Sequence, residues 1–99
     1  MLVAFSVAPG NSAEGVSEAV AAAVRVVRES GLPHETTAMF TTIEGEWDEV
    51  MDVVKRATEA VSARSPRTSL VLKADIRPGY TNQLREKVER VDEHLSEQP

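Results

Sequence analysis

The sequence contains no cysteine and few aromatic residues, and both absences exclude classes of function. Without cysteine there is no disulfide framework, thiolate metal site, cysteine nucleophile or CxxC redox pair. The aromatic residues are two Phe, one Trp and one Tyr in a chain of 99 residues, too few for the stacking platforms that bind single-stranded nucleic acids.

Positive charge and long hydrophobic runs are also scarce. Eleven basic residues against sixteen acidic ones give a net charge of −5, which opposes tight nonspecific binding to nucleic acid. No apolar run approaches the ~20 residues of a membrane-spanning helix. The first nine residues lack a basic segment and predict a strand rather than a signal peptide. We therefore expect a cytoplasmic protein with no membrane partner, folded as a single domain over residues 1–99.

Hydrophobic periodicity and turn residues divide the chain into strands and helices. Turn formers at 9–12 follow the first strand, Gly31 and Pro33 end the first helix, and Ser65-Pro66 ends the second. The expected elements are a strand at 2–8, a helix from 16 to about 30, extended stretches at 34–40 and 42–45, a helix from 47 to about 64, a strand at 68–76 and a helix from about 83 to 95.

This order predicts an α+β fold, a ferredoxin-like βαββαβ sandwich with an additional C-terminal helix. The face of the second helix expected in the core carries Trp47, Val50, Met51, Val54, Ala57 and Val61. The core face expected for the last strand carries Leu70, Leu72, Ala74 and Ile76.

In such a sandwich the helices cover one face of the sheet only. In the first strand both alternating sets of side chains are largely apolar or small, so a wholly polar second face is improbable. We therefore expect oligomerisation through this open face, assisted by the terminal helix.

Hydroxyl and carboxylate side chains gather where an extended stretch meets the second helix. Thr41, Thr42, Glu44 and Glu46 could bind an amine-containing or amidine-like ligand. The structural alternative is that the threonines favour the strand and the glutamates favour the first turn of the helix. Phe40, beside them, could line a pocket or fill a space between subunits.

The last strand carries Lys73, Asp75 and Arg77 on one face. These residues could meet a charged ligand, or they could form an exposed ladder of ion pairs that adds little stability. Elsewhere, His34 and His94 have no metal-binding spacing, so no metal site is expected. The loop at 9–15 lacks the lysine of a P-loop, so capping is its expected role.

Two segments together resemble the small thiamine-binding protein family. They are Val24-Arg25-Val26-Val27-Arg28-Glu29-Ser30-Gly31-Leu32-Pro33 and Thr42-Ile43-Glu44-Gly45-Glu46-Trp47-Asp48-Glu49-Val50-Met51. The resemblance covers nearly the whole chain. It implies a ferredoxin-like domain, dimers that pair into a tetramer, and binding of thiamine or its hydroxymethylpyrimidine moiety without catalysis and without a cofactor.

The resemblance also implies the ligand-binding residues, which are Glu44, Thr42, Thr41, Phe40, Asp75 and Asn11. Three positions differ from the family's usual pattern: Phe40 replaces a common glycine, Ala19 a frequent aromatic, and Ile76 the middle residue of an Asp-Asp-Arg sequence. The alternatives are a cofactor-independent oxygenase on the same fold and a structural or regulatory oligomer without a ligand.

Overall fold

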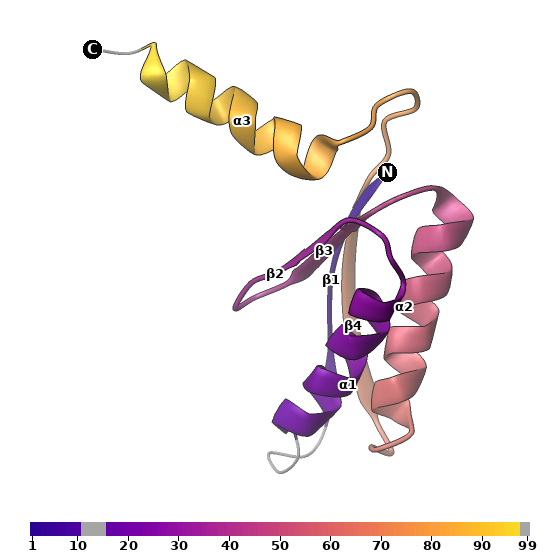
Figure 1. The fold of residues 1–99 in the computed structure, drawn as a ribbon. Helices are drawn as coiled ribbons and strands as arrows, with labels where there is room; N and C mark the ends of the chain where they lie inside the picture. The colour runs from indigo at the N-terminus through magenta and orange to yellow at the C-terminus, as the bar shows by residue number, and fades with distance from the viewer. Residues whose placement is uncertain (11–15, 98–99) are drawn as a thin grey trace.

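Three helices and four strands make up this computed structural model, which describes residues 1–10 and 16–97 (Figure 1). The candidate residue Asn11 lies outside the described residues. The elements are β1 (Leu2–Pro9), α1 (Val16–Glu29), β2 (His34–Thr36), β3 (Thr41–Glu44), α2 (Trp47–Ser62), β4 (Thr68–Asp75) and α3 (Gln83–Ser96). Within the described ranges, no helix is both long and apolar enough to cross a bilayer.

The four strands form one antiparallel sheet in the order β2-β3-β1-β4. Helices α1 and α2 lie side by side on one face of this sheet (Figure 1). This arrangement confirms the predicted α+β, ferredoxin-like fold with an added C-terminal helix. The opposite face of the sheet is called the open face below.

The hydrophobic core lies between the two helices and the central strands. Strand β1 contributes every second side chain, Val3, Phe5 and Val7, because successive residues of a strand point to opposite faces. Ile43 of β3 is fully buried beside them. The helices contribute stripes at helical spacing: Ala19, Ala23 and Val27 from α1, and Val50, Val53, Val54, Ala57 and Val61 from α2.

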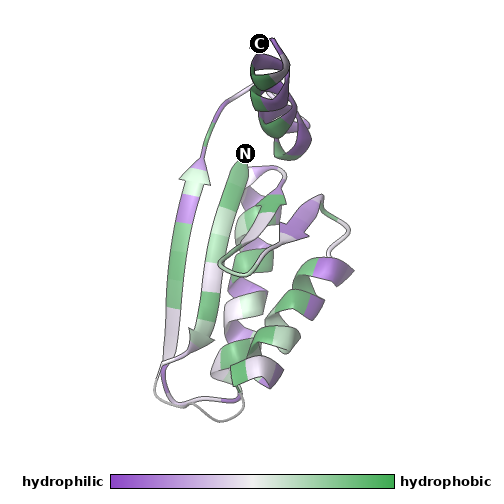
Figure 2. Cartoon of the chain, turned by 90° about the vertical axis from the view of Figure 1, so that its left-hand side faces the viewer, coloured by the Kyte–Doolittle hydropathy of each residue, from purple (hydrophilic) through white to green (hydrophobic). Residues whose placement is uncertain are grey.

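The predicted core face of β4 is only partly covered. Leu70 and Leu72 pair with core residues of β1, yet they remain 42% and 36% exposed. Ile76 lies beyond the end of the strand and is 60% exposed, so its assignment to the core was wrong. The reason is topological: β4 is an edge strand, and the helices pack mainly over β1. Figure 2 shows the hydrophobic bands along this outer strand.

Two other details differ from the expectation. The stretch at 34–40 is not one strand, because a turn at 37–40 separates β2 from β3; in this turn the Thr37 backbone N–H donates to the Phe40 carbonyl at 2.9 Å. Trp47 is 55% exposed rather than in the core. It is the first residue of α2, one turn before the buried stripe begins at Val50.

Helix α3 projects from one end of the sheet and leaves the packed body (Figure 1). Its apolar stripe is uncovered, with Val88, Val91 and Leu95 each more than half exposed. Only Gln83, its first residue, is buried. The position of α3 therefore depends on contacts of its N-terminal half.

Candidate functional site

Three of the predicted site residues share the open face of the sheet. Leu2 of β1 lies opposite Glu44 of β3 on one side and opposite Asp75 of β4 on the other. Ala4 is flanked in the same way by Thr42 and Lys73. Directly paired residues of antiparallel strands point to the same face, so two rows of side chains cross three strands here. The register brings together residues that are more than thirty positions apart in the sequence.

A cavity of about 370 Å³ lies at these rows. Leu2 and Ala4 form its floor, because they are the residues of β1 that point to the open face. Its polar groups come from both sides of β1 and from α3: they are Thr42, Lys73, Asp75 and Lys87. We call this the open-face cavity. It contains two of the predicted residues, Thr42 and Asp75.

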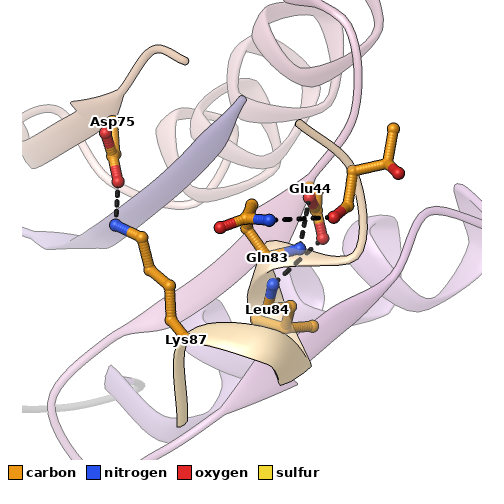
Figure 3. Close-up of polar contacts among 6 residues, drawn as sticks. Glu44, Asp75, Gln83, Leu84 and Lys87 are labelled. Atoms are coloured by element: carbon orange, nitrogen blue, oxygen red, sulfur yellow. Dashed lines mark hydrogen bonds and ion pairs between the residues drawn. The ribbon is translucent and has the colours of Figure 1, made fainter. Parts of the chain in front are cut away.

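Asp75 is held in its charged form within the cavity. The Lys87 ammonium group of α3 donates a hydrogen bond to Asp75 Oδ2 and forms an ion pair with it (Figure 3). This hydrogen bond and the charge of Lys87 lower the pKa of Asp75 below 3.8, and Arg77 and Lys73 add to the effect. The partner of Asp75 is therefore a helix residue rather than a neighbour on its own strand.

Arg77 does not join the row of charges on β4. Its guanidinium lies 3.5 Å from the centroid of the Tyr80 ring, in a cation–π contact just beyond the strand. The ladder of Lys73, Asp75 and Arg77, one of the two alternatives for this face, is thus replaced by two separate contacts, and Lys73 belongs to neither.

Glu44 is buried and caps helix α3. Its Oε2 accepts a hydrogen bond from the Gln83 backbone N–H at 2.8 Å, and its Oε1 accepts one from the Leu84 N–H at 3.1 Å (Figure 3). The N-cap residue Asn82 has a left-handed backbone with φ of 56° and makes no capping bond through its own side chain. A carboxylate from a distant strand therefore satisfies two of the free N–H groups at this helix end.

Glu46 has a structural role at the start of α2, the alternative to ligand binding that its position in the sequence allowed. It is the N-cap residue of α2, and its backbone N–H donates to Glu49 Oε1 at 3.2 Å, as in a capping box. Thr41 faces the helices rather than the open face, since it pairs with Phe5 of the core. Its hydroxyl is 3.2 Å from that of Thr36.

Phe40 and Thr41 line a different cavity, between the β2–β3 turn, α1 and β1. Its volume is about 160 Å³, below the range of about 300–1,000 Å³ of most ligand pockets. The predicted site residues are therefore divided between the two faces of the sheet. Phe40 borders a small space inside one chain.

Two larger depressions contain fewer of the predicted residues. One of about 560 Å³ lies beside α3 and is lined by Glu44, His34, Arg85, Glu86 and Glu89, among others. Its carboxylates already have partners: Glu86 pairs with Arg90 and Glu89 with Arg85, at 3.8 and 3.9 Å. The other, of about 520 Å³, follows the outer side of α1 and contains none of the predicted residues.

Sequence patterns did not single out Lys87 and Gln83. Gln83 is 5% exposed; its Nε2 donates to the Thr81 carbonyl at 3.0 Å and to Glu86 Oε2 at 3.3 Å, while its Oε1 has no partner among the described residues. Both residues become important only because Glu44 and Asp75 hold the start of α3 at one end of the sheet. No local spacing reveals a contact between elements so far apart. Within the described ranges, no three His, Asp or Glu residues gather as metal ligands do.

Comparison with known proteins agrees with this architecture. The family described as "Thiamine-binding protein" matches residues 3–92 of the chain. A UPF0045 protein of Mycobacterium bovis is 58% identical over 96 residues, which are 96% of this chain and 94% of that protein. The crystal structure of a hypothetical protein of Methanocaldococcus jannaschii has a TM-score of 0.84 and 30% identity, and covers 93% of this chain and 95% of the other.

A second solved structure carries a functional description. It is a candidate thiamine biosynthesis/salvage protein of Thermotoga maritima, with a TM-score of 0.78 and 28% identity. The alignment covers 91% of this chain and 96% of that one.

Proposed function

The chain belongs to the thiamine-binding protein family, and we propose that it binds thiamine or the hydroxymethylpyrimidine moiety of thiamine in the open-face cavity, without catalysing a reaction. The observation that carries the proposal is the convergence of Thr42 and Asp75. They come from strands on opposite sides of β1 and line one cavity, on either side of the floor made by Leu2 and Ala4.

The lining of the cavity offers an aminopyrimidine an apolar floor and hydrogen-bonding partners. The apolar floor made by Leu2 and Ala4 gives a flat ring a surface to lie on. The exocyclic amine needs an acceptor, which the Asp75 carboxylate supplies: one oxygen bonds Lys87, and a carboxylate can accept several further hydrogen bonds. The Thr42 hydroxyl can donate to a ring nitrogen. At about 370 Å³ the cavity falls within the usual range for small ligands.

Calorimetric titration of the purified protein with thiamine, hydroxymethylpyrimidine and the thiamine phosphates tests this function. Thr42→Val removes the hydroxyl and keeps the side-chain shape, and Asp75→Asn removes the charge. Each should weaken binding by roughly tenfold, the cost of about one lost hydrogen bond to a buried or charged group.

Two matched variants serve as controls. Asp52→Asn removes a carboxylate that is paired with Arg56 on the exposed side of α2, and Ser69→Ala removes an exposed hydroxyl from β4. Both should bind like the unmodified protein. Absence of binding at millimolar ligand would refute the proposed function. If Thr42→Val and Asp75→Asn both bind the ligand with normal affinity, the ligand binds in another cavity. Consumption of the ligand would contradict a non-catalytic role.

We infer that the chain also assembles into dimers that pair as a tetramer. The support is uncovered apolar surface: Val71 of β4 is 56% exposed on the open face, and the stripe of α3 is more than half exposed. Apolar side chains left exposed on two elements can be covered when chains associate. Light scattering at micromolar concentration should give a mass of four chains, and a mass of one chain would refute this assembly.

A further inference from the structure

The open-face cavity brings two ammonium groups close together. They belong to Lys73 and Lys87, and its lining has one carboxylate, that of Asp75. Glu44, the next carboxylate on this face, is engaged by backbone N–H groups of α3. The whole chain has a net charge of −5. The lining of the cavity is therefore less acidic than the chain as a whole, and its ammonium groups can attract an anionic group on the ligand.

The two lysines differ in how much of their charge is compensated. Lys87 forms an ion pair with Asp75, and the two charges offset one another (Figure 3). Lys73 makes no ion pair with any residue in the described part of the chain, although it lies two positions from Asp75 on the same face of β4. Lys73 is therefore the ammonium group available to a ligand.

The register places Lys73 opposite Thr42 across the cavity. Both residues flank Ala4, and neighbouring strands are about 4.8 Å apart, so their backbones are separated by about 10 Å. A ligand whose ring lies over Ala4 near Thr42 would direct a substituent toward Lys73. A cation in that substituent, such as a thiazolium ring, would approach a like charge.

We propose that the preferred ligand of this cavity is a phosphate monoester of the pyrimidine alcohol, with the phosphate bound by Lys73. This inference rests on the proposed function, since it assumes that the ring binds at Thr42 and Asp75. A phosphate offers an ammonium group charge-assisted hydrogen bonds that a neutral hydroxymethyl group cannot match. The free alcohol and thiamine are then the weaker ligands.

Calorimetry with the full chain tests this preference, using hydroxymethylpyrimidine, its monophosphate, thiamine, thiamine monophosphate and inorganic phosphate. The monophosphate of the pyrimidine should bind about tenfold more tightly than the alcohol, as expected for one partly exposed charge-assisted contact. Only the affinity for the phosphorylated ligands should fall as salt is raised.

The variants assign the effect to one side chain. Lys73→Gln should reduce the affinity for the pyrimidine monophosphate to that for the alcohol and leave the alcohol unchanged, while Lys73→Arg should retain most of the preference. Lys55→Gln, an exposed lysine of α2 without an ion pair among the described residues, removes the same charge elsewhere and should change neither affinity.

The outcomes separate the two proposals. Equal affinities for the monophosphate and the alcohol, or equal weakening of both by Lys73→Gln, would overturn the phosphate preference and leave the proposed function standing. Inorganic phosphate binding as tightly as the monophosphate would overturn it too, because the ring would then contribute nothing. If neither pyrimidine ligand binds, the proposed function itself fails.

Discussion

Replacing Glu44 with alanine should undock helix α3 while the rest of the protein stays folded. The Glu44 carboxylate bonds the backbone N–H groups of Gln83 and Leu84, and Gln83 is the buried residue of this helix. Losing a capping side chain costs about 0.5–2 kcal/mol, and hydrogen bonds to a charged group are at the upper end of that range. We expect a loss of about 2 kcal/mol, or roughly a thirtyfold rise in the opening equilibrium of α3.

The effect should remain local because α3 contributes almost nothing to the hydrophobic core. Val88, Val91 and Leu95 are exposed in the docked position, and the pair of Lys87 and Asp75, a further link to the sheet, is itself half-exposed. Amide hydrogen exchange measures this directly. The exchange rates of the Gln83 and Leu84 amides should rise roughly thirtyfold, whereas those of Ile43 and Val3 should not change.

Two further variants make the measurement decisive. Glu44→Gln keeps one carbonyl acceptor but turns an amide group toward the second N–H, so its effect should be intermediate. Glu59→Ala removes an exposed carboxylate from α2 and should leave α3 unchanged. Unaltered exchange at Gln83 and Leu84 in Glu44→Ala would refute the capping role. Uniform acceleration over the whole sheet would refute the independence of α3.

Two other predictions concern the core and the ion pair. Ile43→Ala should lower the free energy of unfolding by about 3 kcal/mol in urea denaturation because Ile43 is fully buried, whereas Ile76→Ala should change it by less than about 0.5 kcal/mol; similar values for both would contradict the assignment of the core. Lys87 lowers the pKa of Asp75 below 3.8, so the stabilising effect of the pair should be complete above pH 3.8 and disappear as the pH falls through the lowered pKa. In Lys87→Met, an NMR titration should show the pKa of Asp75 rising back toward 3.8. An unchanged pKa would exclude Lys87 as the main cause of the lowering.

The sequence predicted the order of elements because each has a local signal. The alternation in β1 and the spacing of valines in α2 are set by backbone geometry. Helix α1 ends just before Gly31, which adopts a positive φ of 78°, and Pro33 prevents its continuation. The degree of burial was harder to predict. Leu70 and Leu72 alternate as core residues do, but only the topology shows that β4 is an edge strand that the helices cover in part.

Only part of the candidate site was predicted, because the sequence does not reveal the topology of the sheet. Alternation places Thr41 and Thr42 on opposite faces, yet as neighbours in the sequence they were both expected at one pocket. Thr42 and Asp75 converge only through their register with β1, which a single sequence does not reveal. The contacts that α3 makes with Glu44 and Asp75 depend on the path of the segment between β4 and α3. No periodicity encodes that path.

The central position of β1 has a consequence for how the chain folds. Leu2 pairs with Glu44 on one side and with Asp75 on the other, so the first strand to be synthesised obtains its second partner only when most of the chain exists. Contacts of such long sequence separation carry a large loop-closure entropy and slow the folding of small domains. Until β4 docks, one edge of β1 stays unpaired in the nascent chain. Closure of this last strand pair, rather than formation of either helix, should set the folding rate of the domain.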